Sequence, residues 1–216
     1  AACNGQTRVI LTTSLNENES GADFLESSVR FHQPKTMEEE VKRLQTLRSY
    51  LILDSENELP FERLTALASR TFKTPMALVS LVDVDRQWFV SNRGMGNVRE
   101  THRKHAFCAH AIASDEDIMI VRDTTQDPRF NNNPLVTGSP FIRFYAGAPL
   151  ISPEGHKLGT FCVIDTAPRP DGLDLNDKQN LREFSALAVQ VLVTRRRKRE
   201  RECEQNSQLI SCIAHD

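Results

Sequence analysis

The sequence has 216 residues, 39% of them hydrophobic and 26% charged, which fits one medium-sized domain with extensions better than two full domains. Its 27 Lys and Arg residues nearly balance 29 Asp and Glu residues, so the net charge of -2 excludes a general electrostatic attraction to nucleic acid or to an anionic membrane. No apolar run approaches the roughly 20 residues that a membrane-spanning helix needs, and we therefore expect no membrane and no nucleic-acid partner.

The chain begins with a polar segment and continues into two helices. Residues 1–36 are rich in Asn, Ser, Thr, Glu and Gly without sustained periodicity, which predicts a flexible leader. Apolar residues recur at helical spacing from Met37, and a break at Asp54 and Asn57 separates a first helix from a second. The apolar faces of these helices are Val41, Leu44, Leu47 and Leu51, then Phe61, Leu64, Leu67, Ala68 and Phe72.

Apolar runs bounded by turn residues predict the strands of a sheet. The predicted strands are 76–82, 87–91, 118–121, 141–149 and 157–165. A short helix is expected at 106–113. The stretch 123–140 is longer than the ~12–15 residues usual for loops in compact domains, so it either contains short helices or forms a binding site.

The sequence is helical in pattern from Asp174 to its end. Its seam of alternating three- and four-residue steps is apolar at first, then polar, and apolar again at Leu209 and Cys212. The seam consists of Leu181, Phe184, Ala188 and Val191, followed by Arg195, Lys198, Glu202 and Gln205. We expect its apolar part to form a homodimer, with a folded domain at 37–193 and a connecting helix at 194–216.

Helices, a hairpin, a long loop, a second hairpin and a final helix indicate the α+β class, with helices packed on a central antiparallel sheet. Several separated segments then resemble one family: LRSYLILDSENELPFERLTALASRTFKTPMALVSLVDVDRQWFVSNRGM, FCAHAI, DPRFNNNPLVTGSPFIRFYAGAPL and GTFCVID. They are similar in order and distance to the GAF sensor domains of bacterial-type signalling proteins, over residues 38 to about 193. The resemblance implies about five to six strands, dimerising helices on one face and a loop-covered pocket on the other.

The last six residues, SCIAHD, resemble the opening of the phosphoacceptor motif of histidine kinases, in which a His precedes an acidic residue on a dimerisation helix. This second resemblance implies that His215 accepts phosphate. It also implies a kinase catalytic domain and a response regulator as partners in a full-length two-component system. The rest of that motif and an ATP-binding domain do not occur in this sequence, so we expect no complete enzyme activity from the fragment.

The family resemblance implies a pocket for a small molecule, whose identity, like that of any cofactor, the sequence leaves unknown. Its expected wall residues are Trp88, Cys108, Asp123, Arg129, Phe130, Asn133, Arg143 and Tyr145. Arg143 and Tyr145 share a strand face by the two-residue alternation of strands, and an Arg beside aromatic rings suits an anionic or planar ligand. In the alternative, Arg129 pairs with Asp123 or Asp127 to fix the loop and Phe130 fills the core.

Three other patterns have a functional and a structural interpretation. Three histidines and a cysteine lie within nine residues (His102, His105, Cys108 and His110), but no second pair with ligand spacing accompanies them, so no metal is expected. Cys108 and Cys162 form a redox pair if they face one another, although buried cysteines are more often inert. The basic run 195–201 has no interleaved aromatic residues for base stacking, which favours a solvated helix.

Three functions are compatible with these observations. The first is a sensory input module that detects a small molecule or a redox state and acts through its C-terminal helix on a histidine kinase core. The second is a redox enzyme similar to the free methionine sulfoxide reductases, and the third is a ligand-free dimerisation scaffold. The five scattered cysteines suggest no disulfide framework, so we expect a soluble protein in the reducing cytoplasm.

Overall fold

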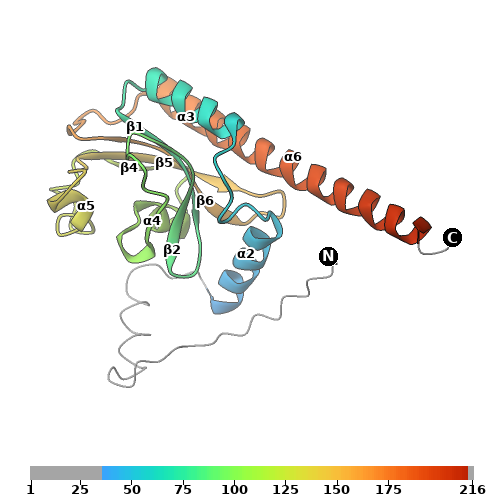
Figure 1. Ribbon diagram of the computed structural model, residues 1–216. Helices are drawn as coiled ribbons and strands as arrows, with labels where there is room; N and C mark the ends of the chain where they lie inside the picture. Colours follow the sequence, from blue (N-terminus) through green and yellow to red (C-terminus); the bar gives the residue numbers. More distant parts are fainter. Residues whose placement is uncertain (1–35, 214–216) are drawn as a thin grey trace.

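The computed structural model describes residues 36–213, with side chains as far as residue 207, and Figure 1 shows its arrangement. The helices and strands are α2 (Met37–Ser49), α3 (Leu59–Thr71), β1 (Met76–Val82), β2 (Arg86–Arg93), β3 (Glu100–His102), the 3₁₀ turn η1 (Arg103–His105), α4 (Phe107–Ala113), β4 (Met119–Val121), α5 (Pro134–Thr137), β5 (Phe144–Ile151), β6 (Lys157–Asp165) and α6 (Leu175–Ile213). The predicted leader and His215 lie outside the described residues. No helix among the described residues is long and apolar enough to cross a membrane.

The six strands form one antiparallel sheet in the order β3-β2-β1-β6-β5-β4. β1 and β6 are central neighbours, and every residue of β1 is buried because helices or loops cover both faces of the sheet. The predicted α+β class with a central antiparallel sheet is therefore confirmed. β3 was not predicted, since its three residues are polar or charged and show no apolar alternation.

One face of the sheet is covered by α3 and α6, which lie side by side across it in Figure 1. Phe184 of α6 is central to this layer: its ring stacks on Phe161 of β6 at 5.3 Å between centroids and lies 5.8 Å from the ring of Phe72. Leu181 and Ala188, one turn to either side, are also buried. The domain's own sheet therefore covers three of the four apolar seam residues, and the homodimer stays a prediction.

The opposite face is covered by α4 and by the loops around α5 (Figure 1). Strand alternation divides the side chains between the two layers: Val79 and Leu81 of β1 face the helices, whereas Leu78 and Ser80 face α4. The long stretch 123–140 contains the single turn of α5, in agreement with the expectation that it contains short helices. This second layer holds the candidate site.

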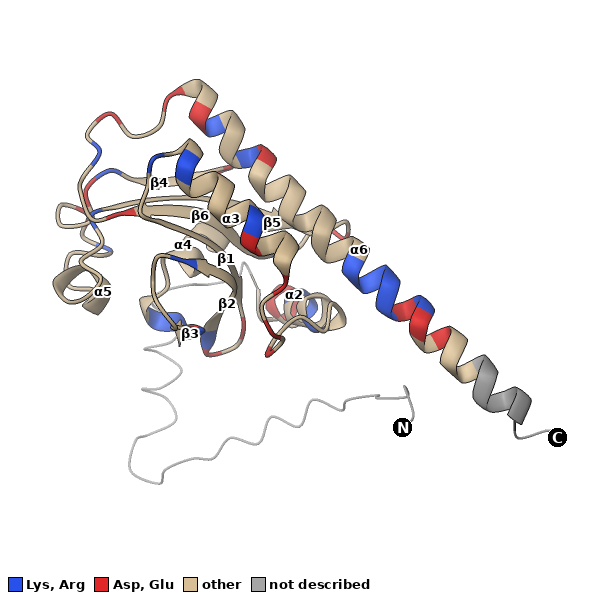
Figure 2. Cartoon of the chain, turned by 45° about the horizontal axis from the view of Figure 1, so that its top comes forward, with Lys and Arg blue, Asp and Glu red and all other residues tan. Residues whose placement is uncertain are grey.

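The point where α6 leaves the domain is fixed by two arginines. The Arg195 side chain is only 9% exposed, forms an ion pair with Glu58, and donates hydrogen bonds to the carbonyl oxygens of Tyr50 and Leu51. Arg196 pairs with Glu154 in the β5–β6 turn. Figure 2 shows the basic run at this exit. The interpretation of the run as a solvated helix is thus wrong for its first two residues, because both are partly buried and paired with carboxylate groups of the domain.

Candidate functional site

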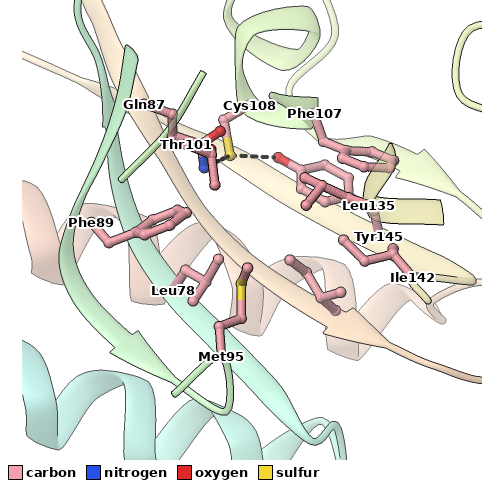
Figure 3. Close-up of a pocket in the computed structure, with 11 residues that line it drawn as sticks. Leu78, Gln87, Phe89, Met95, Thr101, Phe107, Cys108, Leu135, Ile142 and Tyr145 are labelled. Atoms are coloured by element: carbon pink, nitrogen blue, oxygen red, sulfur yellow. Dashed lines mark hydrogen bonds between the residues drawn. The ribbon is translucent and has the colours of Figure 1, made fainter. Parts of the chain in front are cut away.

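A polar cluster centred on the Cys108 sulfur lies inside the otherwise apolar layer between α4 and the sheet. Cys108 Sγ accepts hydrogen bonds from Ser80 Oγ at 3.0 Å, Gln87 Nε2 at 3.2 Å and the Tyr145 hydroxyl at 3.4 Å. Cys162 Sγ lies 3.9 Å away. Figure 3 shows Gln87 and Tyr145 approaching the sulfur from either side. Four strands therefore place polar groups around one sulfur atom of α4.

The local sequence explains why these groups meet. Ser80, Gln87, Tyr145 and Cys162 occupy positions on β1, β2, β5 and β6 that face α4. Stacking fixes α4 itself, because the ring of Phe107 lies 4.1 Å from that of Phe130 and 5.2 Å from that of Tyr145.

Gly147 allows the Tyr145 hydroxyl to reach the cluster. A Cβ atom at position 147 would lie 2.2 Å from the Tyr145 hydroxyl oxygen, well inside contact distance. Gly147 lies on the same strand face as Tyr145. Because it has no side chain, it leaves room for the tyrosine side chain to reach Cys108.

The two thiols differ in acidity because their hydrogen bonds differ. Burial opposes ionisation of Cys108, but hydrogen bonds led by those from Cys162 and Ser80 outweigh it and lower the pKa of Cys108 to about 6. Burial and the adjacent Cys108 sulfur raise the pKa of Cys162 well above its usual value. Cys108 is therefore the thiol that ionises first, and Cys162 remains protonated and can donate to it.

A cavity of about 20 Å³ adjoins this cluster. Gln87, Thr101, Cys108 and Tyr145 form part of its lining, together with apolar residues such as Met95 and Leu135 (Figure 3). This volume has room for roughly one water molecule, whereas sites for drug-sized ligands measure roughly 300–1,000 Å³. The domain's own side chains thus fill the space that the sequence resemblance assigned to a ligand.

Comparison with known proteins identifies the fold and the family. The sequence profile of the GAF domain matches residues 56–192, which is more than half of the chain. The chain belongs to the GAF domain family. A cyclic di-GMP phosphodiesterase from Pseudomonas aeruginosa is 42% identical over 156 residues, which cover 72% of this chain and 26% of that protein. The chain thus spans about a quarter of the length of this relative.

Solved structures share the fold at low sequence identity. The domain of a candidate two-component sensor histidine kinase from Sinorhizobium meliloti 1021 superposes with a TM-score of 0.52 at 14% identity, covering 68% of this chain and 99% of that one. The free methionine-R-sulfoxide reductase from Neisseria meningitidis, solved with its substrate, gives 0.52 at 17% identity, covering 78% and 97%. At such identities these structures agree with this GAF domain in fold alone.

Two of the eight predicted wall residues, Cys108 and Tyr145, line the cavity of this GAF domain. Trp88 does not, and its assignment to the pocket is wrong. Its ring belongs to the helix-side core, where the guanidinium groups of Arg86 and Arg99 lie 5.3 and 4.8 Å from the ring centre. Strand alternation places Gln87 and Phe89, its two neighbours, on the cavity side instead.

The three predicted residues Arg129, Phe130 and Asn133 hold the long loop in place. Arg129 forms an ion pair with Asp127 at 2.7 Å, and Phe130 is fully buried against Phe107, which is the structural alternative that the sequence left open. Asn133 caps α5 and donates to the carbonyl oxygen of His105. None of the three lines the cavity. Asp127 engages Arg129, backbone groups engage Asn133, and Phe130 is packed in the core.

Asp123 and Arg143 also have structural partners. Asp123 accepts hydrogen bonds from the backbone and the hydroxyl of Thr125. Arg143 precedes β5 and donates to the carbonyl oxygens of Val136 and Ile142, so its guanidinium does not line the cavity beside Tyr145. The expectation that Arg143 holds an anionic ligand there finds no support in this geometry.

The histidine-rich segment does not gather metal ligands. Among the described residues, no group of three or more His, Cys, Asp or Glu side chains could hold a metal ion. His102 and His105 lie 6.0 Å apart between ring centres, and His110 packs edge-on against Phe130 at 4.7 Å. Burial and, next, the charge of Arg129 lower the pKa of His110 to about 4, so this imidazole is neutral at physiological pH.

Sequence reasoning missed Ser80, Gln87 and Thr160, which surround the two sulfurs. Thr160 shares hydrogen bonds with Ser80 and Tyr145. A signal was present in the segment MALVSLV, where a lone Ser interrupts an apolar strand that is buried along its whole length. A buried hydroxyl needs a partner, and such a position therefore marks a polar cluster in the core.

Proposed function

We propose that this GAF domain is the signal-input module of a larger regulatory protein and that α6 carries its conformational state to an output domain. One observation carries the proposal: α6 is a single helix of 39 residues whose first half belongs to the core and whose second half leaves it. Phe184 contacts the sheet, Arg195 fixes the exit, and Arg197 and the residues up to Gln205 are mostly exposed.

The dimensions of α6 suit such a role. The helix continues from Arg195 to Ile213, a distance of about 27 Å at 1.5 Å per residue. Because protein interiors are close-packed and resist gradual deformation, a rearrangement of β6 is expected to displace Phe184 and, through it, the whole helix. A ligand or modification acts on the output only if it favours one of two such helix positions over the other.

For the output we propose a histidine kinase core. The support is the SCIAHD segment, whose His215 is the proposed phosphoacceptor, with a response regulator as the downstream partner. Since α6 leads directly to this segment, a shift of the helix would change how His215 meets an ATP-binding domain. The second candidate output is a cyclic di-GMP phosphodiesterase, which the relative from Pseudomonas aeruginosa favours.

Phosphate transfer in the full-length protein distinguishes the two outputs. With γ-labelled ATP, the kinase proposal expects acid-labile phosphate that His215→Gln abolishes, and no hydrolysis of cyclic di-GMP. Hydrolysis of cyclic di-GMP without phosphate incorporation would contradict the kinase and support the second candidate.

Insertions into the exposed part of α6 test the relay itself. Two residues inserted after Arg199 rotate the following segment by about 200°, whereas four residues rotate it by about 400°, close to one full turn. The relay predicts that the two-residue insertion changes output strongly and the four-residue insertion much less. Equal output from both variants and the parent would show that α6 transmits nothing.

The other two functions receive less support. A reductase of the free methionine type needs a thiol that substrate reaches, but Cys108 and Cys162 are buried and the adjoining cavity holds roughly one water molecule. The filled cavity supports the ligand-free scaffold better than it supports the reductase. A scaffold does not, however, explain why a polar cluster lies in the core. The cytoplasmic location that we also propose rests on the sequence alone, in which the five cysteines are scattered without a framework spacing.

A further inference from the structure

We propose that Cys108 and Cys162 are a peroxide-oxidised thiol pair, in which Cys108 reacts first and Cys162 then closes a disulfide between α4 and β6. This inference goes beyond the proposed input function. Its chemistry belongs to the domain alone and does not depend on which output domain follows.

The first support is the composition of the cluster. An apolar core needs no hydroxyl or amide groups, and burying them costs free energy unless they find partners. Here three donors, from Ser80, Gln87 and Tyr145, converge on one sulfur, although a neutral thiol is only a weak acceptor. Such convergence stabilises a thiolate, which is the form that attacks a peroxide.

The second support is the different setting of the two sulfurs. Cys162 lies on β6, which β1 and β5 hold on both sides, whereas Cys108 lies on the seven-residue helix α4. The Sγ atoms are 3.9 Å apart, so a disulfide of about 2.05 Å requires them to approach by roughly 1.9 Å. Side-chain rotation and a small shift of α4 are the movements available for this, because the central strand is held on both sides.

The third support is access for a small oxidant. Cys108 lines the cavity of about 20 Å³, which suits a molecule near the size of water. Hydrogen peroxide is close to this size, whereas aromatic disulfide reagents are far larger than the cavity. We therefore expect the folded domain to react with peroxide and to resist bulky thiol reagents.

The reaction balances with one peroxide molecule. The Cys108 thiolate attacks one peroxide oxygen, an S–O bond forms as the O–O bond breaks, and the hydroxide that leaves takes a proton. Cys162 then loses its thiol proton and attacks the Cys108 sulfur, so that the S–S bond forms and the S–O bond breaks. Two thiols are oxidised to a disulfide, and the peroxide is reduced to two water molecules.

The position of Cys162 connects the reaction to the helix layer. Phe161, its neighbour on β6, points to the opposite face and stacks on Phe184 of α6 at 5.3 Å. The disulfide would therefore join α4 to the strand that supports α6.

The test is oxidation of the native chain with one to ten equivalents of hydrogen peroxide, followed by digestion without reductant and mass spectrometry. We expect a linked peptide that contains Cys108 and Cys162 and has lost two hydrogens. In Cys162→Ser, dimedone added while the peroxide-treated chain is denatured should label Cys108, whereas in Cys108→Ser it should leave Cys162 unlabelled. Linkage absent from the native chain under these conditions would overturn the proposal, as would preferred labelling of Cys162.

Tyr145→Phe tests the role of the hydrogen bonds, since it keeps the ring and removes only the hydroxyl donor. Loss of one hydrogen bond to the thiolate should slow oxidation of Cys108 by about tenfold. Ser80→Ala should act in the same direction. If both variants fold, as shown by circular dichroism, and both are oxidised at the parental rate, the hydrogen bonds do not activate Cys108, which would overturn the role proposed for the cluster. If either variant does not fold, the native chain and Cys162→Ser still decide the outcome.

Discussion

Replacing Arg195 with alanine removes the contacts that fix α6 at the point where it leaves the domain. The guanidinium interacts with the Glu58 carboxylate and with the carbonyl oxygens of Tyr50 and Leu51. Leu51 has a left-handed backbone conformation, with φ of 49°, so these bonds also hold a constrained turn after α2. The variant should loosen both the helix and this turn.

The expected loss of stability follows from the exposure of each partner. Glu58 is one-third exposed, so its ion pair contributes at most about 1 kcal/mol. The part-buried bond to the Tyr50 carbonyl contributes about 1.5–3 kcal/mol, as is usual when the donor is charged, and the exposed bond to Leu51 less. Since such terms overlap, we expect Arg195→Ala to lower the free energy of unfolding by about 2–4 kcal/mol, or the melting temperature by about 5–15 °C.

Arg197→Ala is the matched control, because the same side chain two positions along α6 is exposed. Urea unfolding should show a change within about 0.5 kcal/mol for this variant. If the two variants agreed within that margin, the contacts of Arg195 would contribute nothing, and the basic run would be a solvated surface throughout.

Three further predictions concern the helix layer, the pH and the oligomeric state. Phe184→Ala should destabilise the domain by about 3–5 kcal/mol in urea unfolding, because it removes a ring stacked in the core, whereas Leu187→Ala, on the exposed side of α6, should cost less than about 1 kcal/mol. Folding lowers the pKa of His110 from 6.5 to about 4, so between these pH values only the unfolded chain binds a proton at this residue. The free energy of unfolding should therefore fall as the pH decreases from 6.5 to about 4. His110→Phe should flatten this part of the plot of stability against pH. If the chain is a homodimer through α3 and α6, Leu67 and Leu187 are among the exposed apolar side chains that these helices offer. Leu187→Glu should then reduce the mass seen by light scattering, and an unchanged dimer would exclude this face.

Regular elements followed from periodicity alone. The strands 76–82 and 157–165 and the helix starting at Met37 agree with the structure at the predicted limits. They do so because apolar alternation or helical spacing continues over seven or more residues. The strand predicted from 141 begins at Phe144, since Arg143 and Ile142 still belong to the loop that closes over α5.

The candidate site was accessible to the sequence only in part. Cys108 and Tyr145 were predicted because they lie in segments with a family resemblance, and both line the cavity. Trp88 was assigned to the wrong face, because a strand buried on both sides carries no polar alternation to show which residues face the pocket. A hairpin prediction locates a strand but leaves its rotation about its own axis undetermined.

What the sequence by itself determined is the class of the fold, the order of its elements and the helix that extends from it, because local spacing and turn chemistry specify these. Only the tertiary structure decided which face each side chain occupies, that α6 uses its apolar seam on its own sheet, and that Cys108 and Cys162 lie 3.9 Å apart. The two sulfurs are 54 positions apart in the chain and are brought together by the packing of α4 on β6. Contacts of this kind depend on the register and twist of the strands. The packing of the whole domain determines these, and no single segment of the sequence specifies them.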